Sequence, residues 1–337
     1  MVTIYDIAKY CGVSAATVSK VINHYPTVSK STQDRVHRAM KELHYIPNTT
    51  AQQLSKGGSK NIGVLIFFGE DVPCFKHVLC SSILDSFKIE MERNHYDLVF
   101  ISKNVGGQKG GFYEHCISRN VEGVIIFGDS DAPEVRPILH SDLPVVAFDY
   151  IGDDISGVYS DNYQKMCEMT QYLVDLGHRD IVYIHGENSE ITKLRVNGFC
   201  DTLKKNGIEI HEHSLMAGRY WTKKETEELT KKILQSEHRP TAIMYPDDYC
   251  ALMGMGIIQE MGLSIPQDIS ITGFDGIEMG KMVHPYLTTI SQDTKQLGKV
   301  LADELFERIQ NPHMKPRQIC VDADLVVGES AGIYQKK

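Results

Sequence analysis

The stretch VTIYDIAKYCGVSAATVSKVINHYPTVSKSTQDRVHRAMKELHYIPNTTAQQL, residues 2–54, decides the fold of the amino-terminal part of the chain. Within it, Thr3 and Asp6 have the spacing of a capping box, which predicts that a first helix begins directly after Thr3. Gly12 follows this short helix, and glycine readily takes the left-handed conformation in which many helices end. The sequence therefore predicts a short helix that is closed by a tight turn.

A second helix, Ala15–Ile22, is predicted after the turn, because Ser14 is a favourable N-cap. The apolar residues of this segment fall on one helical face, which leaves small and polar residues on the other. Small residues let a helix approach the floor of a DNA groove, and Ser, Lys and Asn supply donors for phosphates and base edges. The outward residues are Ala16, Thr17, Ser19, Lys20 and Asn23.

A third helix is predicted from after Ser29 to about Leu43, because apolar residues recur there at helical spacing. This order of helices is typical of a helix-turn-helix DNA-binding domain, although any small three-helix module shares parts of it. Residues 1–60 hold eight Lys or Arg against three Asp or Glu, which gives them a formal net charge of +5. The whole chain has a net charge of −9, so the remaining residues have a net charge of −14. A basic end on an acidic body favours attachment to nucleic acid through that end.

Short motifs along essentially the whole chain point to one protein family. In the amino-terminal headpiece, residues 1–46, they are T-I-Y-D-I-A at 3–8, G-V-S at 12–14, T-V-S-K-V-I-N at 17–23, V-S at 28–29 and Y-I-P-N at 45–48. In the body, residues 61–337, they are I-G-V at 62–64, V-E-G-V-I at 121–125, L-G-H-R at 176–179, R-V-N-G-F at 195–199, G-F-D at 273–275 and L-T-T-I-S-Q-D at 287–293. With these motifs the sequence resembles the lactose-repressor/galactose-repressor (LacI/GalR) family. The resemblance implies a homodimeric transcriptional regulator that reads a palindromic DNA operator.

The resemblance also implies that the second helix lies in the major groove, with Ala15, Ala16 and Lys20 as the main readers of base sequence. Many relatives carry Arg at position 20. Lys lacks the two-pronged fork with which Arg binds guanine, so the preferred bases there stay open. The complete set of expected DNA-binding residues is Thr3, Tyr5, Ser14, Ala15, Ala16, Thr17, Ser19, Lys20, Asn23, Ser29, Tyr45, Asn48, Ala51 and Leu54.

Residues 48–54 are implied by the resemblance to form a hinge helix on the operator. Leu54 from each of two copies would wedge into a central base step of the minor groove, expected to be C-G, and kink the duplex. Taken alone, Leu54 is also compatible with an ordinary linker residue. The polar segment 56–60 that follows has the composition of a flexible tether.

The composition favours a soluble, cytoplasmic protein of more than one domain. The chain has 337 residues, of which 42% are hydrophobic, enough to bury a large core. Its eight cysteines are scattered without a C-x-x-C pair, and its fourteen histidines show no metal-binding spacing, which indicates reduced thiols and no metal site. No segment resembles a signal peptide or a membrane span, so we expect no membrane attachment, and we expect no cofactor.

Residues 61–337 alternate between short apolar runs and amphipathic segments, which predicts an α/β body of parallel sheets with helices on both faces. The resemblance implies two doubly wound subdomains of the periplasmic-binding-protein type, with a ligand in the cleft between them. The expected strands are 62–68, 98–102, 121–127, 145–148, 181–184, 242–245 and 269–274, and the expected helices include 162–176, 193–206, 224–235 and 249–261.

The predicted organisation has three parts. A helix-turn-helix domain occupies 1–46, a hinge helix and linker 47–60, and an effector-binding and dimerisation domain 61–337. Within the last, the first subdomain comprises about 61–160 and 292–321, and the second about 161–291 and 322–330.

Three aspartates and one arginine mark the expected ligand site. Asp149, Asp247 and Asp275 each follow an apolar run, and ligands of parallel sheets bind at the carboxyl ends of strands. Carboxylates accept hydrogen bonds from neighbouring hydroxyl groups, and the guanidinium of Arg195 can donate two parallel hydrogen bonds. This combination suits a polyhydroxyl ligand. An aspartate after a strand is often only a helix N-cap, and Asp248 in particular is placed to cap a helix that begins near 249.

The resemblance implies that Arg195, Asp247 and Asp275 contact an effector, as does Asp149, with Phe148 and Trp221 as apolar faces for a sugar ring. Relatives often carry Asn at position 247, and the extra negative charge of aspartate favours a neutral sugar over a sugar phosphate. The glycine-rich segment 106–111 lacks the order of a phosphate-binding loop and is expected to be a mobile surface loop.

The leading hypothesis is a dimeric repressor of sugar-utilisation genes whose operator affinity is changed by a small carbohydrate. An alternative within the same fold is a global catabolite regulator that is controlled by a phosphocarrier protein. An enzyme on a nucleotide-binding sheet would need a phosphate loop or a catalytic cluster, and the sequence holds neither. The effector, the operator, and the choice between induction and co-repression stay open.

Overall fold

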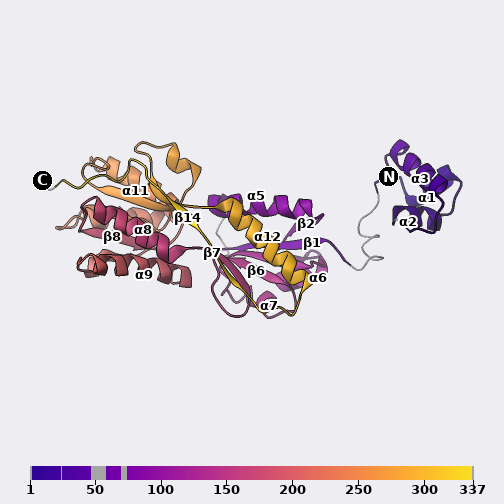
Figure 1. Cartoon of the computed structure of the whole chain (residues 1–337), viewed down its shortest axis with the longest axis horizontal. Coiled ribbons are helices and arrows are strands. Elements are labelled where there is room, and N and C mark those ends of the chain that lie inside the picture. The colour runs from indigo at the N-terminus through magenta and orange to yellow at the C-terminus, as the bar shows by residue number, and fades with distance from the viewer. Residues whose placement is uncertain (1, 24, 47–57, 70–73, 336–337) are drawn as a thin grey trace. The chain divides into compact units, whose positions relative to one another are not determined.

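The computed structural model describes residues 2–23, 25–46, 58–69 and 74–335. The chain separates into two compact units, Met1–Lys60 and Asn61–Lys337 (Figure 1). The predicted DNA-binding residues Asn48, Ala51 and Leu54 lie outside the described residues.

The first unit is built from three helices, α1 (Ile4–Cys11), α2 (Ala15–Ile22) and α3 (Lys30–Glu42). The predicted capping box is present, since Asp6 Oδ2 accepts from the Thr3 backbone N–H at 2.8 Å and the Thr3 side chain accepts from the Asp6 N–H. Gly12 ends α1 at φ 62°, and the Ser14 side chain caps α2 by accepting from the Thr17 N–H. These three predictions of local structure are confirmed.

The hydrophobic core of the first unit lies where the three helices meet. Ile7 of α1, Val18 and Val21 of α2, and Val36 and Ala39 of α3 are all buried there. Because this core takes up the apolar stripe of α2, the opposite face of that helix is left at the surface.

The second unit contains two six-stranded sheets. The first has the strand order β13-β7-β6-β5-β1-β2, and every neighbouring pair is parallel. Side chains alternate along the strands, so that Ile125 and Phe127 of β5 face a core with α5 and α12, whereas Val124 and Ile126 face a core with α6 and α7 (Figure 1). The strands are β1 (Asn61–Phe67), β2 (Asp97–Phe100), β5 (Gly123–Gly128), β6 (Val145–Phe148), β7 (Ser156–Ser160) and β13 (Gln318–Val321), and the helices are α5 (Val78–Arg93), α6 (Phe112–Ser118), α7 (Arg136–Leu139) and α12 (Thr294–Gln310), with the short η1 (Cys74–Lys76).

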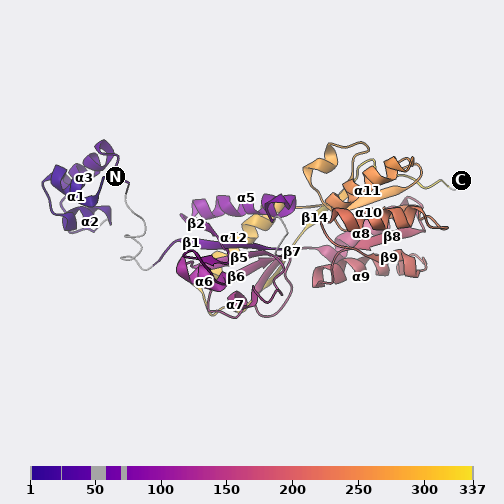
Figure 2. The same ribbon diagram turned by 180° about the vertical axis from the view of Figure 1, so that it is seen from behind.

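The second sheet has the order β14-β12-β11-β10-β8-β9 and is parallel except for β14, which runs antiparallel to β12. Helices α8 and α9 pack on one face and α10 and α11 on the other (Figure 2). The expected fold class, two doubly wound subdomains of largely parallel sheet, is confirmed. The elements are α8 (Asn162–Asp175), β8 (Ile181–His185), α9 (Glu190–Lys205), η2 (Glu212–Ser214), β9 (Leu215–Ala217), α10 (Lys223–Leu234), β10 (Ala242–Met244), α11 (Asp248–Glu260), β11 (Ser270–Asp275), η3 (Glu278–Lys281), β12 (Thr288–Gln292) and β14 (Ala323–Val326).

The chain passes between the two sheets three times, after β7, after β12 and after β13. The three passages are tied together by hydrogen bonds. Ser160 Oγ donates to Gln292 Oε1 at 2.6 Å, and the Asp161 N–H donates to the carbonyl of Val321 at 3.0 Å. We call the part around the first sheet the first subdomain and the part around the second sheet the second subdomain. A change in the angle between the two subdomains has to bend the chain at all three passages together.

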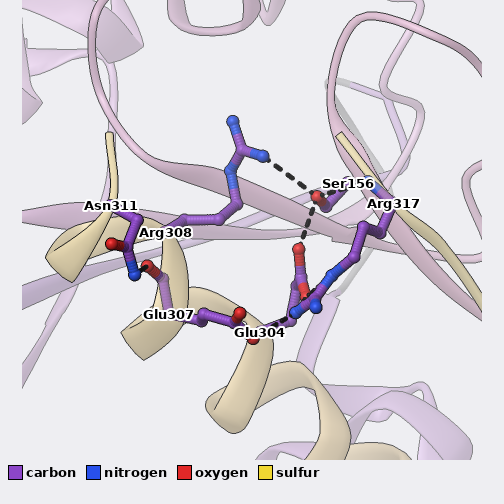
Figure 3. A network of polar contacts seen from close by, with 6 residues as sticks. All are labelled: Ser156, Glu304, Glu307, Arg308, Asn311 and Arg317. Carbon is purple, nitrogen blue, oxygen red and sulfur yellow. Dashed lines mark hydrogen bonds and ion pairs between the residues drawn. The ribbon is translucent and has the colours of Figure 1, made fainter. Parts of the chain in front are cut away.

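A polar network anchors two of these passages inside the first subdomain (Figure 3). Ser156, at the start of β7, donates to Glu304 Oε1 at 2.7 Å and accepts from Arg308 Nη1 and from the Arg317 N–H. The Arg317 guanidinium also pairs with Glu304 and Glu307 of α12. Because Glu304 is buried and fully paired, the network fixes α12 and the approach to β13 against β7.

The glycine-rich segment, expected to be a mobile surface loop, contains a short antiparallel hairpin of β3 (Asn104–Val105) and β4 (Gln108–Lys109). Gly106 and Gly107 turn the chain at φ 58° and 86°, the positive values that a two-residue hairpin turn requires. A phosphate-binding loop would instead join a strand to a following helix.

Candidate functional site

The outward face of α2 carries most of the expected base-reading residues. Ala16 and Lys20 are exposed, and Ala15, Thr17 and Ser19 are half-buried. Ser14 Oγ lies 2.9 Å from Thr17 Oγ1, so the cap and the first turn present two adjacent hydroxyls. The half-buried Asn23 closes the helix, and its side-chain amide donates to Ser19 Oγ at 3.4 Å. This face offers hydroxyl and ammonium donors beside small side chains, which suits a DNA groove.

The remaining described DNA-binding candidates surround that helix. Thr3 and Ser29 are exposed at the starts of α1 and α3, where backbone N–H groups favour an anion such as a phosphate. Tyr5 on α1 is 73% exposed, whereas Tyr45 is half-buried and packs against the core of the unit. Their roles on DNA stay predictions.

In the second unit, the three expected aspartates stand at the carboxyl ends of strands. Asp149 follows β6, Asp247 follows β10 shortly before α11, and Asp275 is the last residue of β11. Asp247 and Asp275 are buried, and Asp149 is half-buried. Asp149 belongs to the first subdomain and the other two to the second, so the candidate ligand site draws on both sheets. We call these three residues and Arg195 the charged cluster.

Arg195 of α9 is the guanidinium of this cluster and is 3% exposed. Its Nε donates to Asn162 Oδ1 at 2.6 Å, its Nη1 donates to the Pro246 carbonyl at 3.0 Å, and its Cζ lies 3.6 Å from the centre of the Phe274 ring. These contacts fix the orientation of the fork. Burial raises the pKa values of Asp149, Asp247 and Asp275, and the charge of Arg195 opposes this rise in all three, so all three lie within its electrostatic reach.

Asp247, and not Asp248, is the N-cap of α11, which corrects the sequence-based expectation. Asp247 Oδ1 accepts from the Cys250 N–H at 2.7 Å, and the helix begins at Asp248. The Asp248 carboxylate instead accepts from the Ile277 N–H at 2.8 Å and from the Thr289 hydroxyl, so it holds the loop after β11. Two adjacent aspartates both fit the local capping pattern, and only the path of the preceding loop decides between them.

Asp275 takes part in a hydrogen bond that sequence reasoning missed. Gln292 Nε2 donates to Asp275 Oδ1 at 2.8 Å, and the other end of the same amide accepts from Ser160. Burial, with Asp247 and Asp248 nearby, raises the pKa of Asp275 well above its usual value. Gln292 lies in the motif at 287–293, but nothing local in that motif indicates its partner.

The two expected aromatic residues differ in position. Phe148 is 4% exposed and packs in the core of the first subdomain, 5.9 Å from the Phe127 ring, so little of its face is free for a ligand. Trp221 is half-buried, and its indole stacks on His77 and on Tyr249 at centroid distances of 4.1 and 5.1 Å. His77 was not foreseen, because it precedes a helix, α5, that was not among the predicted segments.

Asp149 is the least compensated member of the charged cluster. Its Oδ1 is shielded from solvent and has no hydrogen-bond partner within the described part of the chain. Burial raises the pKa of this carboxyl to about 6, although Arg195 opposes the shift. A carboxyl with a raised pKa in the folded state destabilises the fold once it ionises, so the loss of stability develops between about pH 4 and pH 6 and persists above.

We therefore expect Asp149→Asn to stabilise the second unit at pH 7.5. Because Asp149 is only half-buried, solvent screens part of the cost, and we expect a gain of about 1–2 kcal/mol. Thermal unfolding of both proteins at pH 4 and pH 7.5 measures it. The gain should vanish near pH 4, where the wild-type carboxyl is protonated, and an equal gain at both pH values would contradict this assignment.

The charged cluster can hold a small polar molecule but shows no sign of a metal. Among the residues that the structure describes, no three His, Cys, Asp or Glu side chains are arranged to bind a metal ion. No helix within the described ranges is long and apolar enough to cross a membrane. Carboxyl groups within the electrostatic reach of a fixed guanidinium are suited to hydrogen-bonding hydroxyl groups.

Comparison with known proteins finds a match in each of the two units. Residues 3–48 match the family described as bacterial regulatory proteins, lacI family, and residues 170–331 match a periplasmic binding protein-like domain. The HTH-type transcriptional repressors PurR of Vibrio vulnificus (strain CMCP6) and Pasteurella multocida (strain Pm70) are 30% and 31% identical to this chain, and each match covers 98% of both chains.

A solved structure, that of the Lac repressor dimer bound to operator and the anti-inducer ONPF, is also similar over the whole chain. It matches with a TM-score of 0.82 and 30% identity, over 98% of this chain and 99% of that one. These relatives are repressors and not enzymes. With an exposed helix-turn-helix face and a two-subdomain α/β body, this chain is a DNA-binding transcriptional repressor and belongs to the lacI family of bacterial regulatory proteins.

Proposed function

We propose that the protein represses sugar-utilisation genes as a homodimer on a palindromic operator, and that a small neutral sugar bound at the charged cluster changes its operator affinity. One observation supports the choice of ligand: three carboxyl groups, those of Asp149, Asp247 and Asp275, lie within the electrostatic reach of a single guanidinium, that of Arg195. A site with this excess of negative charge disfavours phosphate, whereas sugar hydroxyls donate to carboxylates and accept from arginine.

Exposed apolar side chains support the dimer. Phe75, Ile89 and Phe100 come from η1, α5 and β2, where β2 is an edge strand of the first sheet, and the Phe75 and Phe100 rings pack at 5.1 Å. Met282, just after η3 in the second subdomain, is 75% exposed. Apolar groups of this size at a surface favour a protein interface. A two-fold dimer would present two headpieces to a palindrome. The wedge role of Leu54, on a central C-G step, belongs to the same proposal.

The test is a titration of the full-length protein on an operator that is first selected from random DNA. Fluorescence anisotropy would follow binding while neutral sugars, sugar phosphates and purines are added. We expect one neutral sugar to change operator affinity at least tenfold and the selected DNA to be palindromic. A response to sugar phosphates alone would overturn the assignment of a neutral ligand. If no small molecule acts and a phosphocarrier protein raises operator affinity, the catabolite-regulator alternative replaces the proposal.

A further inference from the structure

Four aromatic rings form a continuous ladder between the two subdomains. Phe68 follows β1 and His77 is the N-cap of α5, so both belong to the first subdomain. Trp221 precedes α10 and Tyr249 lies in α11, so both belong to the second. Successive centroids are 5.0, 4.1 and 5.1 Å apart, with interplanar angles of 10°, 30° and 12°. The shortest step, from His77 to Trp221, is the one that joins the subdomains.

The two central rings are each held by their own subdomain. His77 Nδ1 accepts from the Cys80 N–H at 3.4 Å, which places the proton of the neutral imidazole on Nε2. Burial lowers the pKa of His77 to about 4, so the ring is neutral near pH 7 and stacks without a charge to desolvate. Trp221 takes a left-handed backbone conformation at φ 56°, and its backbone N–H donates to Asp247 Oδ2 at 2.9 Å.

We propose that His77 and Trp221 form an aromatic clasp that holds the two subdomains together. The three chain passages join the subdomains covalently but act as bending points, whereas the clasp is a direct side-chain contact that opening has to break. Stacked aromatic pairs shift such equilibria by about threefold to tenfold. The clasp is therefore strong enough to favour closure and weak enough to be released.

The clasp shares a hydrogen bond with the charged cluster. The carboxylate oxygen of Asp247 that holds the Trp221 backbone belongs to a residue that we assign to the effector site. A ligand hydroxyl that donates to the same oxygen would compete with the Trp221 N–H and loosen the indole. This second step rests on the proposed function, whereas the clasp itself rests only on the stacking of His77 on Trp221.

The chain has a single tryptophan, so its intrinsic fluorescence reports on the clasp directly. The test compares the full-length wild type with His77→Ala, His77→Phe and His140→Ala, all without ligand. His140 is an exposed histidine of the same subdomain and serves as the matched control. His77→Phe keeps a stacking ring and loses the Nδ1 acceptor and the Nε2–H donor, so it remains informative if His77→Ala folds poorly.

For His77→Ala we expect at least a twofold rise in acrylamide quenching of Trp221, together with a larger radius of gyration by small-angle X-ray scattering. His77→Phe and His140→Ala should match the wild type in both. Increased quenching with unchanged scattering would mean that His77 only covers the indole, and it would overturn the clasp, as would wild-type values for both. Because no ligand is added, failure of the sugar titration leaves this result intact, and the two proposals fail separately.

Discussion

Ala16→Glu is expected to weaken operator binding by at least about 100-fold, or roughly 2.7 kcal/mol. Ala16 is exposed on α2, beside Lys20 and the Ser14 and Thr17 hydroxyls, on the face that we assign to the DNA groove. A carboxylate at this position would meet the phosphates and acceptor-rich base edges of the groove, and juxtaposed like charges cost several kcal/mol. Fluorescence anisotropy on the selected operator, at a fixed salt concentration, measures the change.

The fold should tolerate this substitution, because the side chain points away from the core and glutamate is a good helix former. Ala217→Glu is the matched control, since it makes the same charge change at an exposed position of the body. Circular dichroism should be unchanged for both variants, and only Ala16→Glu should lose the operator. If both variants bind within about threefold of the wild type, α2 does not face the groove in the way proposed.

Arg195→Ala is expected to abolish the response to the effector while operator affinity in its absence stays near the wild-type value. The substitution removes the donor fork of the charged cluster and leaves its aspartates without their cation. Removing one partner from a buried group of charges lowers the free energy of unfolding by about 3–5 kcal/mol, so we also expect a lower Tm for the body at pH 7.5. The loss should be smaller near pH 5, because burial raises the pKa of Asp149 to about 6 against the opposing charge of Arg195, and a carboxyl that is protonated there no longer needs a cation.

Arg195→Lys and Lys193→Ala complete this experiment. Lysine keeps the positive charge but cannot reproduce the paired contacts to Asn162 and the Pro246 carbonyl, so we expect a folded protein whose effector affinity falls at least about tenfold. Lys193 is exposed on the same helix and pairs only with Glu190, so its loss should leave the response unchanged. A normal effector response in both Arg195 variants would remove this residue from the ligand site.

Sequence reasoning succeeded where the deciding interactions are local. Thr3, Gly12 and Ser14 set the ends of two helices through contacts within a few residues, and the structure has these helices at the predicted positions. The strand at 145–148 and the helices near 162–176 and 249–261 were also found to within about a turn, because apolar periodicity is visible in a short window. The family's motifs added the expectation of two subdomains.

The segments that were missed depend on tertiary packing. The strands β7 and β12 are short and rich in polar residues, and they become strands because neighbouring strands bury them. The strands β13 and β14 have only four residues each and lie at the edges of their sheets. Helices α5 and α12 pack against each other, and Gly298 lets them approach so closely that a Cβ there would lie 2.6 Å from the Ile83 carbonyl oxygen. No local pattern specifies such a contact.

The candidate ligand site also has some features that follow from local sequence and others that depend on tertiary packing. The sequence by itself predicted that aspartates would stand at the ends of strands, because strand ends are set locally. It predicted that the helix carrying Arg195 begins at 193, whereas α9 begins at Glu190 after the Ser189 N-cap. Only the tertiary structure decided that Asp247 caps α11, that Gln292 links Asp275 to Ser160, and that His77 stacks on Trp221. Each of these contacts joins residues whose approach is fixed by the strand order and by the three passages between the sheets, and no short stretch of sequence contains that information.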